Sequence, residues 1–387
     1  MKICLISMEY PPENAWTGIG TYTYNMSHAL VGLGHEVHVF ALALKSERVY
    51  PDGKVTVHRI KLTRPPVSVF TDPVGCILYS QKISSKIVKS ALNFDVIEAP
   101  EWRAEGFASS FYFRRSLITR LHMPLFLLNK LSSKELTPAD KIVNFLEMRQ
   151  TVQSVGVTSS TMALKKIVCK HWRIDESQVT VIPNGLNIEK LRASATKSLI
   201  GSDYIVYVGQ LEPRKGVHIL AMALPLVFEK FKNLKVVFIG FDTLYNNISM
   251  KEFILKINAK HQKNLVFTGF VPEETKLSLI KNSKFVVLPS LWEAFGYTCL
   301  ESMALGKAVI ATKNSGFEEI IEDGHSGFLV EPGSHSALAK EILDCLLSED
   351  KVQGAEKNAA KRVNAFDAKT VAQSLLKYYK KSLEERK

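Results

Sequence analysis

Two glutamates and the turn between them have the clearest capacity for chemistry in this sequence. Glu293 and Glu301 lie in the stretch VVLPSLWEAFGYTCLESMALG (286–306), where an apolar strand gives way to a helical pattern beginning near Phe295. A helix start presents free backbone N–H groups and the positive end of the helix dipole, and Gly296 lets a ligand approach the backbone closely. The stretch predicts a phosphate site flanked by carboxylates that accept hydrogen bonds from sugar hydroxyls. The same spacing is also common for two surface carboxylates.

A pair of basic residues stands in a similar position in the stretch YIVYVGQLEPRKGVHIL (204–220), which is typical of a strand, a loop and a helix from about Lys215. Arg214 and Lys215 fall at the start of that helix, where a cation is unfavourable against the helix dipole unless an anion compensates it. We therefore predict a phosphate neighbour. The alternative is a surface loop with two ordinary basic residues.

The loop after the first strand, MEYPPENAWTGIGTYTYN, matches a dinucleotide-binding fingerprint only in part. Gly18 and Gly20 have the required spacing, but Thr23 occupies the place of the third glycine. A dehydrogenase is therefore disfavoured. A glycine turn that opens a helix at Thr21 still suits a phosphate from a ligand held by another domain.

His122 follows the apolar run SLITRL, so we expect it at the carboxyl edge of a first parallel sheet. A lone histidine is more often structural than functional. Its position nevertheless makes it a better catalytic candidate than the other histidines.

Several signatures are missing from the chain. It contains no Asp-x-Asp, HExxH, GxSxG or GxxxxGK[ST], and its five cysteines form no CxxC pair. We therefore expect no metal and no cofactor. The charge of a departing diphosphate would be neutralised by Arg214, Lys215 and backbone N–H groups.

The elements that must position these residues form two βαβ series. Strands are predicted near 2–8, 36–42, 55–60, 94–98, 117–121, 155–158 and 179–182, and then near 204–209, 234–240, 265–268, 284–289, 308–311 and 326–330. The fold class is α/β, with two Rossmann-like, doubly wound parallel sheets. IPNGLNIEK (182–190) breaks regular structure, so we place the domains at 1–183 and 184–367, followed by a final amphipathic helix, 368–387.

With 46% apolar and 23% charged residues and no long apolar run, the chain is predicted to be soluble and cytoplasmic. Its net charge of +12 is spread over both halves, which does not favour nucleic acid as a partner. Arg114, Arg115 and Arg120 cluster within FYFRRSLITRLHMPLF. This cluster is either a peripheral contact with an anionic membrane or a solvated helix face followed by a buried strand.

Over most of its length, and most strongly from about 200 to 335, the chain resembles the retaining GT-B glycosyltransferases of family four, which include the glycogen synthases. The resemblance is carried by E293-AFGYTCL-E301, VGQLEPRKG, PNGLN, GFVPEE (269–274) and GFEEIIEDGHSGFLVEPG (316–333). It implies two Rossmann-like domains that face each other across a cleft, with the nucleotide-sugar donor mainly on the C-terminal domain and the acceptor mainly on the N-terminal one. It also implies that the last helix, 368–387, crosses back to complete the first domain.

The resemblance also implies roles for single residues. Glu301 would bind ribose, Glu293 and His122 would lie at the donor sugar, and Arg214 and Lys215 would bind the diphosphate. The remaining donor-binding candidates are Gly18, Gly209, Gln210, Val271, Ala294, Phe295, Gly296, Tyr297 and Thr298. Relatives often have arginine where this chain has Gln210, so one phosphate-binding cation is absent.

The acceptor side is expected in IEAPEWRAEGF (97–107), which resembles a segment lining the acceptor cleft in some relatives. Glu101, Trp102 and Arg103 are predicted to be exposed after a strand. Trp102 either stacks on a sugar ring or covers the edge of the sheet.

The function that follows is transfer of a hexosyl unit from a nucleoside diphosphate sugar, UDP-sugar in preference to GDP-sugar, to a glycan or glycolipid hydroxyl. It would proceed with retention and without metal, in polysaccharide or cell-envelope biosynthesis. The alternatives are a sugar-nucleotide epimerase or hydrolase and a catalytically silent nucleotide-sugar-binding subunit.

Overall fold

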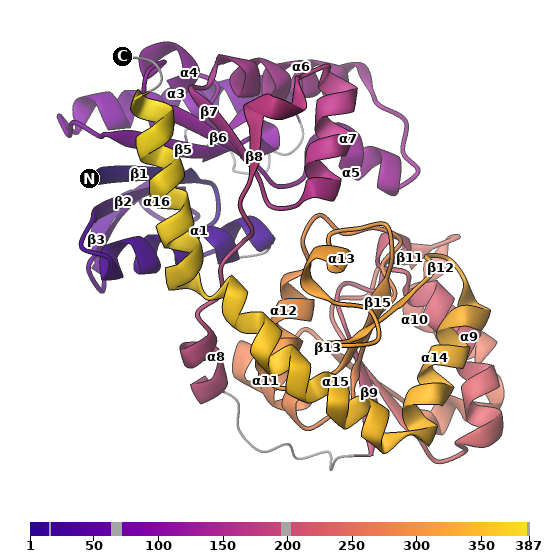
Figure 1. Cartoon of the computed structure of the whole chain (residues 1–387). Coiled ribbons are helices and arrows are strands. Elements are labelled where there is room, and N and C mark those ends of the chain that lie inside the picture. The colour runs from indigo at the N-terminus through magenta and orange to yellow at the C-terminus, as the bar shows by residue number, and fades with distance from the viewer. Residues whose placement is uncertain (15–16, 63–71, 195–202, 385–387) are drawn as a thin grey trace. The chain divides into compact units, whose positions relative to one another are not determined.

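A computed structural model describes residues 1–14, 17–62, 72–194 and 203–384 (Figure 1). The chain forms two compact units, one of residues 1–186 with 366–387 and the other of residues 187–365. Pro183, Asn184 and Gly185, where we predicted the domain boundary, precede the first crossing between the units.

The first unit is built on an eight-stranded sheet with the order β3-β4-β2-β1-β5-β6-β7-β8, parallel except for β3. Its strands are β1 (Lys2–Ser7), β2 (Glu36–Leu42), β3 (Arg48–Asp52), β4 (Val55–Ile60), β5 (Val96–Pro100), β6 (Leu117–Leu121), β7 (Gly156–Ser159) and β8 (Val179–Val181). The central strands are buried on both faces, which explains why their sequences are mainly apolar without a polar alternation. The prediction of a doubly wound parallel sheet is confirmed here.

The sequence analysis missed β3, which pairs antiparallel to β4 at the edge of the sheet. Pro51 and the exposed Arg48 and Val49 give this segment no buried alternation, and proline is tolerated only where one side of a strand is unpaired. Asp52 and Gly53 in the turn are a recognised hairpin signal. That dipeptide could have identified β3 and its antiparallel direction.

Helices cover the two faces of this sheet. They are α1 (Gly18–Gly32), α3 (Pro73–Lys89), α4 (Ser109–Tyr112), α5 (Leu125–Leu131), α6 (Pro138–Gln153), α7 (Met162–Trp172) and α16 (Ala368–Glu384), with short 3-10 turns at η1 (Trp102–Ala104) and η2 (Glu176–Gln178). α1 packs against the C-terminal α16, and α3 packs against α4 and α6. The side chains predicted to face inward from α16 are buried, with Leu375 and Tyr379 fully so.

The second unit has a six-stranded, all-parallel sheet with the order β13-β10-β9-β14-β15-β16. Its strands are β9 (Tyr204–Val208), β10 (Lys235–Ile239), β13 (Leu265–Gly269), β14 (Val286–Leu288), β15 (Val309–Thr312) and β16 (Phe328–Val330). A small hairpin, β11 (Leu244–Tyr245) and β12 (Ile248–Ser249), was not predicted. This unit is also doubly wound, as predicted.

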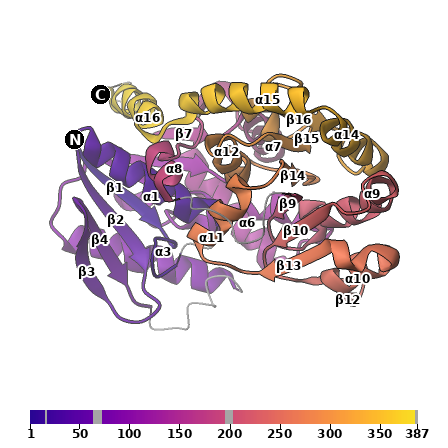
Figure 2. The same cartoon turned by 90° about the horizontal axis from the view of Figure 1, so that it is seen from below.

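The helices of this unit are α8 (Ile188–Ser194), α9 (Val217–Lys230), α10 (Met250–Ile257), α11 (Glu273–Lys281), α12 (Tyr297–Ala304), α13 (Phe317–Ile320), α14 (His335–Leu347) and α15 (Glu349–Arg362). Three 3-10 turns accompany them, at η3 (Pro213–Lys215), η4 (Ala259–Asn264) and η5 (Val363–Phe366). α9 and α14 lie side by side, and α15 continues from α14 (Figure 2).

The strand order of each sheet reverses at one point, beside β1 in the first unit and beside β9 in the second. In open α/β sheets, ligands bind at such a switch point, beyond the carboxyl ends of the strands. In the second unit the switch point lies between β9 and β14, so the loops 209–216 and 289–296 leave the sheet next to each other. These loops carry Arg214, Lys215 and Glu293.

Candidate functional site

The two loops at the switch point of the second unit are locked together by close backbone contact. Gly216 has φ +65°, and a Cβ built on it would lie 1.8 Å from the carbonyl oxygen of Pro289. Leu291 N donates a hydrogen bond to the carbonyl of Arg214, at 2.9 Å. Only glycine fits this approach, so Gly216 holds the basic loop against the acidic one. The sequence analysis did not assign it this role.

At this contact Lys215 Nζ forms an ion pair with Glu293 Oε1, and Ser290 Oγ lies 3.4 Å from the same oxygen. Burial alone would raise the pKa of Glu293, but Lys215 and Arg214 outweigh it and lower that pKa. Glu293 is therefore a buried carboxylate held in its charged form by two cations.

Arg214 contributes a donor that is not used within the unit. Its guanidinium bonds Glu212 at 2.5 Å, while its Nε is buried and has no hydrogen-bond partner among the described residues. Buried donors are nearly always satisfied in folded proteins. An anion at this point would supply the missing acceptor.

Two helices begin at the switch point, and neither start is capped by a side chain. α9 follows Gly216, and α12 follows Gly296, which has φ +101°. A Cβ on Gly296 would lie 2.4 Å from the ring of Phe317, so this position also requires glycine. α12 begins at Tyr297 rather than near Phe295, because Gly296 adopts a left-handed conformation. Uncapped helix starts and basic side chains are both features that favour the binding of an anion.

The second glutamate of the pair has a separate partner. Glu301 is buried on α12 and binds Lys276 of α11 at 2.9 Å. Burial would lower the pKa of Lys276, but Glu301 and Glu273 outweigh it and raise that pKa. The sequence analysis missed Lys276, whose only signal was its place just after GFVPEE. Val271, the candidate for base contact, is half-buried two residues before α11.

The remaining donor candidates in this unit lie on the same edge of the sheet. Gly209 directly follows β9, and its N–H donates to the carbonyl of Ile239 at 2.9 Å. Gln210 is exposed, and its carbonyl accepts a hydrogen bond from Tyr207 Oη at 2.7 Å. Ala294 is buried, and Thr298 is half-buried in the first turn of α12.

In the first unit His122 directly follows β6, at the predicted carboxyl edge. Its backbone N–H donates to both carboxylate oxygens of Glu101, at 2.9 and 2.8 Å, and Met123 N donates to Oε1 at 2.6 Å. Burial, reinforced by the positive charge of Arg120, holds the pKa of His122 well below its ordinary range. The imidazole is therefore neutral at physiological pH.

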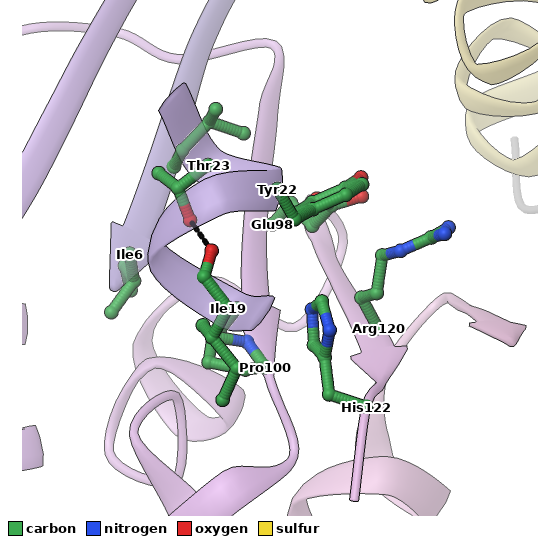
Figure 3. Close-up of a pocket in the computed structure, with 10 residues that line it drawn as sticks. Ile6, Ile19, Tyr22, Thr23, Glu98, Pro100, Arg120 and His122 are labelled. Atoms are coloured by element: carbon green, nitrogen blue, oxygen red, sulfur yellow. Dashed lines mark hydrogen bonds between the residues drawn. The ribbon is translucent and has the colours of Figure 1, made fainter. Parts of the chain in front are cut away.

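His122 lines a small pocket with charged and apolar walls (Figure 3). His122 and Arg120 extend from β6, while Ile19, Tyr22 and Thr23 come from α1. Tyr22 packs edge-on against His122, with ring centres 5.1 Å apart, and donates a hydrogen bond to Glu98 at 2.8 Å. The pocket brings an imidazole, a phenol and a carboxylate together at the switch point of the first sheet.

We predicted that the three acceptor-side candidates are exposed. This is wrong for Glu101, which is fully buried. Inside the unit it accepts the backbone hydrogen bonds of His122 and Met123 and so holds this turn. Trp102 is half-buried and packs against Cys76 of α3, Leu125 of α5 and Val143 of α6. Arg103 lies over the Trp102 ring, 5.3 Å from its centre, and is also half-buried.

The predicted basic cluster is also corrected. Arg114 and Arg115 are exposed, but Arg120 is fully buried, because its guanidinium binds the carbonyl of Ile182 and Oδ1 of Asn184, both at 2.7 Å. Asn184 of the PNGLN motif thus has a structural role. Arg120 cannot contribute to a surface contact.

The helix of the first glycine loop starts earlier than predicted. α1 begins at Gly18 rather than at Thr21, because Thr17 acts as its N-cap and accepts a hydrogen bond from Ile19 N at 3.2 Å. Gly18 is exposed at this helix start. Within the described part of the chain, no helix has both the length and the apolar character needed to cross a bilayer.

Two doubly wound Rossmann-like units in one chain are the architecture of the GT-B class of glycosyltransferases. Sequence profiles agree with the fold: "Glycosyltransferase Family 4" matches residues 16–190, and "Glycosyl transferases group 1" matches residues 192–362. The chain belongs to the family-four glycosyltransferases.

Individual proteins are similar over the full length. An uncharacterized glycosyltransferase of Methanocaldococcus jannaschii is 25% identical, with 99% of each chain covered. Sucrose-phosphate synthase of Thermosynechococcus elongatus superposes with a TM-score of 0.78 at 19% identity, over 98% of each chain. The Anabaena protein HepE, solved in complex with UDP-glucose, has a TM-score of 0.69 at 22% identity, over 98% of this chain and all of that one.

Proposed function

We propose that this protein transfers a hexosyl unit, with retention of configuration and without metal, from a nucleoside diphosphate sugar to a glycan or glycolipid hydroxyl. The observation that carries the proposal is the arrangement of Arg214, Lys215 and Glu293 at the switch point, between two uncapped helix starts.

The diphosphate would bind where α9 and α12 begin. There Lys215 and the unsatisfied Nε of Arg214 would meet phosphate oxygens. Glu293 would then accept hydrogen bonds from the transferred sugar, and Glu301, held by Lys276, those from ribose hydroxyls. UDP-sugar is favoured because HepE, a structural neighbour, was solved with UDP-glucose.

In the proposed reaction the acceptor hydroxyl attacks on the face from which the diphosphate leaves, through an oxocarbenium-like transition state. The negative charge that develops on the diphosphate would be stabilised by Lys215, Arg214 and the start of α12. In the first unit we propose His122 as a catalytic residue, because a neutral imidazole can bond a sugar hydroxyl without repelling the developing positive charge. Gly18 is a further candidate for a phosphate contact.

The decisive experiment begins with thermal-shift measurements against UDP-, GDP- and ADP-sugars, since a ligand of the folded state raises the melting temperature. UDP release is then followed with and without candidate acceptors, in the presence of EDTA, and the anomeric configuration of the product is read by NMR.

We expect acceptor-dependent UDP release that survives chelation. Epimerised donor with the nucleotide still attached would identify the epimerase alternative, and release that needs no acceptor would identify a hydrolase. Binding without turnover would identify a silent subunit, and loss of activity that manganese restores would contradict the metal-free mechanism.

A further inference from the structure

An ion pair joins α11 to α12 in the second unit. Lys276 Nζ of α11 lies 2.9 Å from Glu301 Oε2 of α12, and the two side chains are 22% and 8% exposed. Glu273, whose side chain is 72% exposed, stands 4.0 Å from the same ammonium group. Burying an ion pair costs desolvation energy that its attraction often does not recover, so such a pair contributes little to stability. The closer pairing with the buried carboxylate therefore calls for a functional explanation.

Lys276 belongs to a helix that is fixed in the core. Leu277 and Ile280 of α11 are 1% and 0% exposed. Tyr204 Oη of β9 donates a hydrogen bond to the carbonyl of Leu279 at 2.8 Å, and α11 packs against α12. An ammonium group on a rigid, well-packed element holds its partner more precisely than one on a loop. The position of the Glu301 carboxylate is therefore set by α11 as well as by α12.

Glu301 keeps hydrogen-bonding capacity for a ligand. Among the described residues, only Lys276 bonds its carboxylate, through Oε2, whereas a carboxylate can accept about four hydrogen bonds. Glu301 lies four residues after Tyr297, where α12 begins, which is about 6 Å along the helix axis. In a nucleoside diphosphate the ribose is joined directly to the phosphates. A diphosphate at the start of α12 therefore has its ribose within reach of Glu301.

We propose that Lys276 is a positioning residue that makes the donor site select ribonucleoside diphosphate sugars over their 2′-deoxyribonucleoside counterparts. The inference rests on the proposed function, in which Glu301 accepts hydrogen bonds from ribose hydroxyls. Without Lys276, Glu301 would carry an uncompensated charge in a buried position and would turn toward water. With Lys276 the carboxylate stays in place, and a nucleotide without a 2′-hydroxyl leaves this buried acceptor partly unpaired. Such an unpaired group is what rejects the analogue.

The test is isothermal titration calorimetry of the full-length protein with UDP and with 2′-deoxy-UDP. We expect the wild type to bind UDP at least about tenfold more tightly, because a hydrogen bond to a charged group is lost with the 2′-hydroxyl. Lys276→Met, which keeps a long side chain without its charge, should weaken UDP binding by about tenfold or more and leave binding of 2′-deoxy-UDP nearly unaffected. The ratio of the two dissociation constants then approaches one. Lys276→Arg keeps the charge and should recover most of the ratio.

Lys307→Met is the matched control. Lys307 Nζ binds Glu356 at 3.0 Å, and the two side chains are 18% and 22% exposed, so this variant also removes a partly buried ion pair from the second unit. The melting temperature should respond to both variants, but Lys307→Met should keep the wild-type ratio of dissociation constants. A second arm combines Lys276→Met with Glu301→Gln. Because Lys276 acts through Glu301, the double variant should bind both nucleotides as Glu301→Gln alone does.

Turnover of UDP-glucose gives a further readout. In Lys276→Met, KM should rise by a larger factor than kcat falls, because the ribose lies away from the bond that breaks. The inference fails if the wild type binds the two nucleotides equally, if Lys276→Met, shown to be folded by circular dichroism, keeps the wild-type ratio, or if the losses in the double variant add. UDP still binds in each of these outcomes, so none of them contradicts the phosphate assignment. A wild type that binds neither nucleotide would contradict the proposed function itself, and this inference with it.

Discussion

At the scale of residues, the chemistry depends on how charge is paired inside the protein. Lys215 and Glu293 neutralise each other beyond the end of β14, and Lys276 of α11 and Glu301 of α12 do the same. The sequence analysis predicted three of these four residues from their positions relative to strands and helices. Lys276 was not predicted, because a lysine on a polar helix can be identified as functional only when its partner is known.

Replacing Lys215 should abolish the stabilisation of the leaving diphosphate. We expect Lys215→Ala to lower kcat by about two to four orders of magnitude, as the loss of one charge-stabilising group commonly does. Lys284→Ala is the matched control, because it removes an ion pair to the exposed Asp203 in the same unit. Wild-type turnover in a folded Lys215→Ala protein would rule out the phosphate assignment.

Glu101 should make stability depend on pH. Burial outweighs the hydrogen bonds from backbone N–H groups and raises the pKa of this carboxyl to about 7. The folded state then holds a proton that the unfolded chain releases above its ordinary pKa of about 4.3. The free energy of unfolding should therefore fall as pH rises from about 4.5 to 7.

Urea titrations at pH 5, 6 and 7 would measure this slope. In Glu101→Gln the fall over this range should be smaller by an amount on the order of 2–3 kcal/mol. The contribution of Glu98, whose pKa is also raised, remains in both proteins. Burial and the charge of Glu101 both raise the pKa values of Glu105 and Glu147, so the measured difference includes the loss of this coupling. Identical slopes for the two proteins would show that Glu101 is charged throughout.

At the scale of elements, the buried parallel strands were predictable because they are short, mainly apolar runs with both faces covered. β3 was not, since an edge strand with a proline and exposed side chains has no such pattern. The starts of α9 and α12 were also displaced from their predicted positions. In both cases a left-handed glycine decides where the helix begins, and its conformation depends on the neighbouring chain.

Gly216 is the clearest case of that dependence. We expect Gly216→Ala to destabilise the protein by more than about 2 kcal/mol, because it adds a left-handed alanine and a clash with the Pro289 carbonyl. Gly354→Ala, in the interior of α15 with nothing within 4 Å, should be neutral or should stabilise by about 0.5–1 kcal/mol. Denaturant unfolding of both variants compares the two sites, and similar stabilities would contradict the close approach.

At the scale of the whole molecule, the C-terminal helix completes a unit whose other residues end at Leu186. Tyr379 of α16 donates a 2.8 Å hydrogen bond to Glu98, which also accepts one from Tyr22. Glu98 lines the pocket beside His122. The last helix therefore supports the pocket from a position 281 residues further along the chain.

Removing this hydroxyl tests the long-range connection. Tyr379→Phe should lower the free energy of unfolding by about 1–3 kcal/mol, because Glu98 is left buried with one partner fewer. The comparison is Tyr378→Phe. The Tyr378 hydroxyl donates to the carbonyl of Val157 from a less buried position, so its removal should lower the free energy of unfolding by less. An equal or smaller loss in Tyr379→Phe would argue against this support.

The sequence by itself determined the two βαβ series, the class of fold and the loops that bear the charged residues. Each of these follows from local patterns of apolar residues, glycines and charges. Only the tertiary structure decided that Lys215 meets Glu293 and that Arg120 and Glu101 are buried. These features depend on which strands and helices become neighbours. Segments that are distant in the chain pair without producing a local pattern in the sequence, so their pairing cannot be predicted from it.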